Sequence, residues 1–273
     1  MKKACIILSI ITIACFIISG IIFATKVFSA DNLIVKNIDE KQEIEFAGKH
    51  IYVSGIYANT NIQGYDGDVI KIELVGTYRS FVDDSLSLHT SEGLNSLNIS
   101  IKSKKIFNII SFGVFTSNIE LNILIPNSML YDLTIDGVDK GIKVSNLNLY
   151  NLKLSGVSGK IDVLNVTTQS IDVNGISGNI NLDNITGNLD ISSVSGDIQI
   201  KYLEFDNNID INGVSSSVML YLPKGSDFKL DTDGIHTSVS YYIDNVKQNL
   251  IKTNSKNLIT IDGVSSSIAI YEY

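Results

Sequence analysis

The chain has 273 residues, of which 18% are charged and 8% aromatic, with no tryptophan and two prolines. Its net charge of −8, its pI near 4.8 and its single arginine, Arg79, exclude the basic stripe that nucleic-acid binding needs. Both cysteines, Cys5 and Cys15, lie near the start, so the rest of the chain has no disulfide framework. Abundant Ile, Val, Asn, Ser and Gly with little Ala favour an all-β protein.

The first thirty residues predict a membrane anchor. Lys2 and Lys3 precede an apolar run over residues 4–24, which as a helix is long enough to span a bilayer of about 30 Å. A signal-peptide core is usually shorter, so we expect an uncleaved, single-pass transmembrane helix, with cleavage near Ser29 or Ala30 as the alternative. The positive-inside rule then places the rest of the chain outside the cell membrane.

Residues 31–125 predict an N-terminal β region that continues or caps the repeats described below. Residues 31–49 are either a stalk or a first strand. The stretch IYVSGIYANTNIQ, residues 51–63, resembles an early repeat centred on Gly55, although Thr60 stands where an aliphatic residue is expected. Residues 69–80, 96–104 and 118–126 alternate apolar and polar side chains, which predicts further strands.

One run in this region, residues 106–115, is apolar and contains Phe107, Phe112 and Phe115. We expect a hairpin that covers the open end of the β core, because large exposed apolar patches are uncommon on soluble domains. In the alternative, the three phenylalanines form a surface that binds a membrane or a partner.

Residues 126–273 contain seven copies of one phrase, such as LKLSGVSGKIDV and IDVNGISGNINL. The centres of the copies are spaced 19, 19, 18, 20, 21 and 29 residues apart and fall on Gly137, Gly156, Gly175, Ser193, Gly213, Gly234 and Gly263. Counted from the centre, positions −4, −2, +1, +5 and +7 are mostly Ile, Val or Leu, and the positions between them are mostly polar. This pattern predicts a strand, a bend and a second strand in each copy.

Such a repeat predicts a single-stack β-solenoid, similar to a parallel β-helix, with about 19 residues per coil. The aliphatic positions form the inner core, and no coil is stable alone. The central glycines, with Asp, Asn or Ser before them, are expected to make the bend by tolerating positive φ. Asn146, Asn165 and Asn184 recur at a second bend, where stacked asparagines can bond one another.

The phrases GVSGKI, GISGNI and VSGDI, with their flanking strands, resemble the bacterial putative-adhesin domain family of unknown function, which includes LiaG-type and YvlB-type envelope proteins. The resemblance covers roughly residues 45–273. It implies a β-solenoid in the cell envelope of a Gram-positive bacterium, with an adhesive or stress-related role and no catalytic residues. Ser216, Thr237 and Ser266 replace the glycines at 159, 178 and 196, which puts the turn geometry of those coils in question.

Two outward columns are candidate binding sites. At −3 stand Asp172, Asp190, Asp210 and Asp231, in what the sequence suggests are four successive coils. We expect a solvated acidic face and no cofactor; the alternative is that Ca²⁺ bridges the carboxylates. At +8 stand Tyr221, Tyr242 and Tyr271, which we expect to close the end of the solenoid; the alternative is that they bind sugars or a partner.

The sequence does not predict an enzyme. It has no Ser-His-Asp pattern, phosphate loop or metal-ligand spacing, and His50, His89 and His236 are scattered. We expect a membrane-tethered, adhesin-like interaction module whose partner is a cell-wall polymer or an envelope protein. The alternative is a regulatory partner of an envelope-stress or transport system that docks on membrane proteins.

Overall fold

The computed structural model describes residues 34–55, 58–80, 85–103, 114–137, 140–214, 216–235, 238–243, 246–248, 255–264 and 267–273. Within these residues, no helix is long and apolar enough to cross a membrane. The apolar run at residues 4–24 lies outside the described part of the chain, as do Phe107, Phe112 and the side chain of Phe115.

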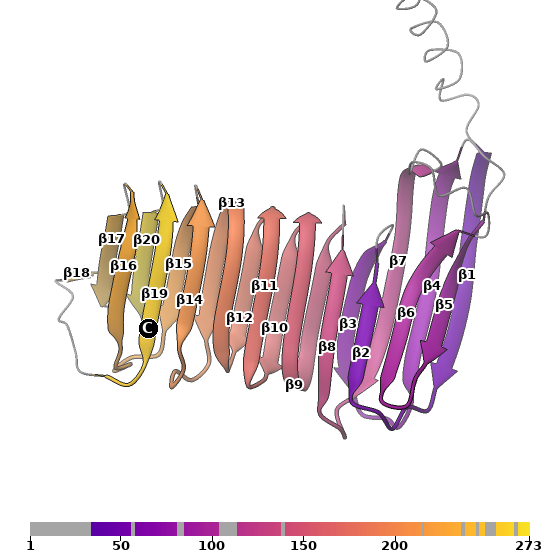
Figure 1. The fold of residues 1–273 in the computed structure, drawn as a ribbon, viewed down its shortest axis with the longest axis horizontal. Helices are drawn as coiled ribbons and strands as arrows, with labels where there is room; N and C mark the ends of the chain where they lie inside the picture. Colours follow the sequence, from indigo (N-terminus) through magenta and orange to yellow (C-terminus); the bar gives the residue numbers. More distant parts are fainter. Residues whose placement is uncertain are drawn as a thin grey trace, which may run out of the picture.

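The described residues form β-strands that stack along one long axis (Figure 1). Most neighbouring strands are parallel, and each coil places one strand in each of two sheets. Sheet A contains, in spatial order, β1 (Ile34–Ile44), β4 (Ile70–Ser80), β7 (Val114–Pro126), β3 (Asn59–Tyr65), the first half of β9 (Ile142–Ser158), β10 (Ile161–Thr167), β12 (Ile180–Ile185), the second half of β13 (Asn188–Tyr202), β15 (Ser216–Leu222), β20 (Ser267–Glu272), β17 (Ser238–Ile243) and β18 (Val246–Gln248).

Sheet B contains, in spatial order, β5 (Leu86–Glu92), β6 (Ser96–Ser103), β2 (His50–Ser54), β8 (Tyr131–Gly137), the second half of β9, β11 (Ser170–Ser177), the first half of β13, β14 (Ile209–Val214), β19 (Leu258–Val264) and β16 (Lys229–Ile235). This arrangement confirms the all-β, solenoid-like fold that the repeat predicts.

The core lies between the sheets and consists of the aliphatic columns. In the coil centred on Gly175, for example, Ile171, Val173, Ile180 and Leu182 are buried, and the outward residues between them are not. The early coil centred on Gly55 is confirmed as well, because β2 pairs in register with β8 and β3 with β9. Its exceptional residue, Thr60, is only 1% exposed and faces Gly55.

The second bend is made by the stacked asparagines. Asn146, Asn165 and Asn184 have φ of 53°, 54° and 53°, the left-handed conformation that Asn tolerates better than most residues. The amide of Asn165 donates to the side-chain oxygen of Asn146 at 2.9 Å, and that of Asn184 to Asn165 at 3.1 Å. The asparagine ladder therefore shapes the bend and links three coils, as predicted.

The central glycines do not make the first bend in the way that the sequence suggests. Gly137, Gly156, Gly175, Gly213, Gly234 and Gly263 lie within strands, and Gly137, Gly156 and Gly175 have no positive φ. The positive φ falls three residues later in two coils, at Gly178 (+139°) and Gly196 (+138°). The central position needs a small residue for another reason: it faces the +5 side chain, and a Cβ on Gly137 would lie 3.2 Å from Ile142.

The order of the coils at the C-terminal end of the stack differs from their order in the sequence. β19 lies between β14 and β16, and β20 lies between β15 and β17 (Figure 1). The last coil of the chain is thus inserted between the two coils that precede it. The 29-residue step before Gly263 supplies the chain that this return requires.

Different side-chain contacts link the strands toward the two ends of the stack. At the N-terminal end, Glu40 accepts from the backbone N–H of Leu88 at 2.7 Å, and Gln42 accepts from the hydroxyl of Thr90 at 2.8 Å, which joins β1 to β5. At the C-terminal end, an edge-to-face chain of rings runs through Tyr202, Phe205, Phe228 and Tyr241, with centroids 5.3, 6.4 and 6.2 Å apart.

Candidate functional site

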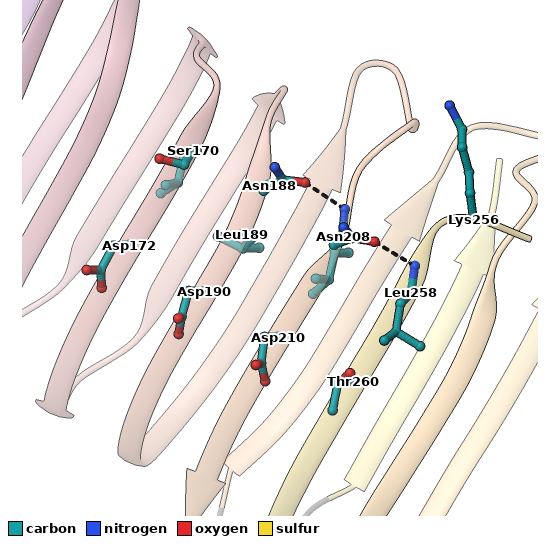
Figure 2. Close-up of a pocket in the computed structure, with 12 residues that line it drawn as sticks. Ser170, Asp172, Asn188, Leu189, Asp190, Asn208, Asp210, Lys256, Leu258 and Thr260 are labelled. Carbon is teal, nitrogen blue, oxygen red and sulfur yellow. Dashed lines mark hydrogen bonds between the residues drawn. The ribbon is translucent and has the colours of Figure 1, made fainter.

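The outer face of sheet B carries the predicted aspartate column (Figure 2). Asp172, Asp190 and Asp210 occupy neighbouring strands in register. Asp231 does not continue the row, because Thr260 of the inserted strand β19 pairs with both Asp210 and Asp231. The prediction of four successive aspartates is therefore wrong, and the column reads Lys153, Asp172, Asp190, Asp210, Thr260, Asp231.

Neighbouring groups already engage two of these carboxylates. Lys153 Nζ lies 3.2 Å from Asp172, and the Asn174 amide donates to Asp172 at 2.8 Å. The Asn212 amide donates to Asp210 at 3.2 Å. Partial burial, followed by the charges of Asp172 and Asp210, raises the pKa of Asp190. Asp190 is thus the carboxylate of the three whose ionised form is stabilised least by its surroundings.

A shallow groove of about 660 Å³ runs along this face beside the aspartates. Its rim is held by hydrogen bonds from backbone to side chain: Asn188 Oδ1 accepts from the N–H of Asn208 at 2.9 Å, and Asn208 Oδ1 accepts from that of Leu258 at 2.8 Å (Figure 2). Lys256 at the far end pairs with Asp206 at 2.9 Å. Among the described residues, no three His, Cys, Asp or Glu side chains are grouped to hold a metal ion. Bridging of the carboxylates by Ca²⁺ stays the alternative prediction, which a titration with calcium would test.

The three tyrosines lie on the outer face of sheet A and do not cover the end of the stack. They stand in the order Tyr221, Tyr271, Tyr242, because β20 lies between β15 and β17. Adjacent ring centroids are 5.0 Å apart in both pairs, with interplanar angles of 14° and 13°. Side chains on an outer face do not cover the open end of the core, so the predicted end-closing role of the tyrosine row is wrong. In the last coil, Phe228 and Tyr241 pack against the core instead.

Stacking determines which part of each tyrosine is available to a ligand. The faces of the rings are turned toward one another, so the row presents ring edges and hydroxyl groups to solvent. Tyr273, 48% exposed, adds a fourth ring on this side, with Lys201 Nζ 4.9 Å from its centroid. Sugar binding by flat stacking on ring faces, the usual mode for single aromatics, is therefore disfavoured within the row.

Sequence reasoning missed two features of these faces. The interleaved last coil sets both the break in the aspartate column and the order of the tyrosines. The single long step of 29 residues was the available signal. The second feature is that the outward +4 and +6 columns change character where the tyrosine row begins.

The fold and these faces define a class of protein: an all-β, solenoid-like stack whose outer surfaces carry rows of similar polar or aromatic side chains. Residues 49–186 and 139–267 match the family Toastrack DUF4097, and the chain belongs to this family. The two matches overlap, as expected when several coils fit the same part of a repeating pattern.

Three solved structures match the chain at low sequence identity. A putative cell adhesion protein from Clostridium sporogenes is 15% identical, with 87% of this chain and 100% of that chain covered and a TM-score of 0.39. A putative adhesin from Bacteroides fragilis is 14% identical, with 87% and 97% covered and a TM-score of 0.43. One from Parabacteroides merdae is 15% identical, with 85% and 95% covered and a TM-score of 0.39. Among curated proteins, none matches the chain.

Proposed function

We propose that this protein is a membrane-tethered, extracytoplasmic interaction module that presents its β-stack, without catalysis, to a surface polymer or an envelope protein. The observation that carries the proposal is the row of three tyrosines on the outside of sheet A, 5.0 Å apart and absent from the core. Tyrosine is enriched at interaction surfaces because it combines a large apolar area with a polar end.

Two further observations support this function. The sequence places Lys2 and Lys3 before the apolar run at residues 4–24, the pattern of an anchor with the remaining chain outside. The aliphatic columns are buried between the sheets, so the long outer faces of the stack are surfaces available to a partner. A partner can bind to such a face through complementary shape and chemistry, without any catalytic residue.

The location is tested by fusing a reporter that is active only outside the cytoplasm to the C-terminus of the full chain. We expect the reporter to be active, and we expect deletion of residues 4–24 to abolish its activity. Activity of a cytoplasm-specific reporter at the same position would contradict the proposed orientation.

The interaction is tested by expressing the full chain in cells and measuring their retention on purified cell-wall sacculi. Replacing Tyr221, Tyr271 and Tyr242 together by serine is expected to abolish retention, while the protein stays folded by circular dichroism. If cross-linking in membranes captures only membrane proteins and sacculi retain nothing, the regulatory alternative replaces the adhesin-like one.

A further inference from the structure

The outer face of sheet A loses its charges where the tyrosine row begins. Outward positions +4, +6 and +8 of the last three strands in spatial order, β15, β20 and β17, form a grid of nine residues without a single ionisable carboxylate or amine. The grid consists of Ser217, Met219, Tyr221, Ser267, Ala269, Tyr271, Ser238, Ser240 and Tyr242.

The same three columns carry charges in the preceding coils. The +4 column has Lys160 and Asp197, the +6 column has Asp162, and the +8 column has Asp183 and Lys201. Lys201 lies directly beside Tyr221 at one border of the grid, and the exposed Lys247 of β18 pairs with Tyr242 at the other. The uncharged grid is thus a bounded patch with a charged rim.

The grid has a raised side and a low side. Ala269 and Ser240 are short, so the rings of Tyr271 and Tyr242 in the next column stand above the sheet beside them. Met219 ends the low side at β15, where it accepts a hydrogen bond from the Tyr221 hydroxyl at 4.0 Å. The result is a step that runs across the strands, with aliphatic and ring-edge surface at its foot and hydroxyl groups along both sides.

The size of the step limits the partner. Three strands about 4.8 Å apart, each with five residues separated by four rises of about 3.3 Å, give a face of about 200 Å². A stable protein interface needs about 800 Å² on each partner, so the grid by itself is too small for a second folded chain. Two copies related by a two-fold axis through Tyr271 would also place Lys201 opposite Lys247, which like charges disfavour.

We propose that this step binds a segment of an uncharged glycan chain, which lies along the stack with its C–H groups on Ala269 and its hydroxyls bonded to the tyrosine and serine hydroxyls. An uncharged ligand fits because the grid has no charge to neutralise and burying an unpaired charge is costly. The assignment rests on the proposed function as a surface interaction module and names the chemistry that the module recognises.

The test measures retention of the full chain, in detergent, on two matched pairs of polymers. Uncharged cellulose is paired with anionic carboxymethyl-cellulose, and uncharged chitin is paired with cationic chitosan. We expect retention on at least one uncharged polymer and at least tenfold weaker retention on its charged counterpart. Equal or stronger retention on the charged polymers, or none on cellulose and chitin, would overturn the assignment.

A variant pair then locates the site. Ala269→Glu puts a carboxylate at the foot of the step, and Asn181→Glu puts one in the same +6 column of β12, outside the grid. We expect at least a tenfold loss of retention for the first and no loss for the second, even though Asn181→Glu also replaces a hydrogen bond to Asp162 by like-charge repulsion and so lowers the melting temperature. Equal losses would refute the location. Sacculus retention without binding to either uncharged polymer would leave the interaction module intact and remove only the glycan assignment.

Discussion

Gly178 is the position where one added methyl group tests the geometry of the arch most directly. Its φ is +139°, and a Cβ there would lie 2.1 Å from the carbonyl oxygen of Gly159 and 2.9 Å from its carbonyl carbon. Real Cβ atoms essentially never approach closer than 3.0 Å. Both clashing atoms are backbone atoms of the preceding coil, so no side-chain rotation relieves the contact. Gly178→Ala must therefore separate two stacked coils or change the backbone conformation.

The expected cost of Gly178→Ala is about 3 kcal/mol. Holding a residue other than glycine in such a sparsely populated conformation costs roughly 1–3 kcal/mol. The displaced coil weakens ladder hydrogen bonds worth about 1 kcal/mol each. For a domain of this size, 1 kcal/mol lowers Tm by about 2–4 °C. Thermal unfolding followed by far-UV circular dichroism should therefore show a Tm lower by roughly 6–12 °C.

Gly175→Ala is the matched control in the same coil. Gly175 has no positive φ, and a Cβ there would meet only Ile180, at an ordinary contact distance of 3.6 Å. We expect a change within about 0.5 kcal/mol. Equal Tm values for the two variants would refute the conclusion that the later glycine, and not the central one, is required by backbone conformation.

Three further predictions concern the asparagine ladder, the aspartate column and the buried tyrosines. Asn165→Ala should cost about 2 kcal/mol, because it loses both the left-handed backbone preference and the ladder bonds, and Asn165→Gly should recover about half of this in Tm measurements. Asp190→Asn should stabilise the protein by a few tenths of a kcal/mol in urea unfolding at low salt, since it removes a partly buried charge and its repulsion by Asp172 and Asp210. The gain should be smaller at 1 M NaCl, because salt screens only the repulsion. Asp231→Asn, beside Thr260, should change nothing, and an equal gain there would contradict the column order. Burial raises the pKa of Tyr202, so the folded state holds the phenol proton more tightly than the unfolded state. The free energy of unfolding should therefore be unchanged below about pH 10 and fall above it, by up to about 1.4 kcal/mol per pH unit. Urea midpoints should show a less steep fall for Tyr202→Phe.

The repeat determined much of the fold from the sequence alone. Alternating aliphatic residues on either side of each central position, such as Ile171, Val173, Ile180 and Leu182, can be buried together only if the two strands of a coil turn the same side inward. The asparagine ladder followed from the same spacing, because Asn165 recurs one coil from Asn146 and from Asn184. The outward direction of the aspartates and tyrosines was fixed by the period of two along each strand.

Only the tertiary structure decided the order in which the coils stack. Every coil offers the same inward columns, so the strand carrying Asp210 can pair in register with that of Asp231 or with that of Thr260 at nearly equal local cost. The choice depends on contacts that no single coil contains: the chain of rings from Tyr202 to Tyr241, and the return of the chain before Leu258. That order breaks the aspartate column, sets the tyrosine sequence and places Ala269 and Tyr271 in the middle strand of the uncharged grid, so the arrangement of the candidate site depended on the one property that the repeat leaves open.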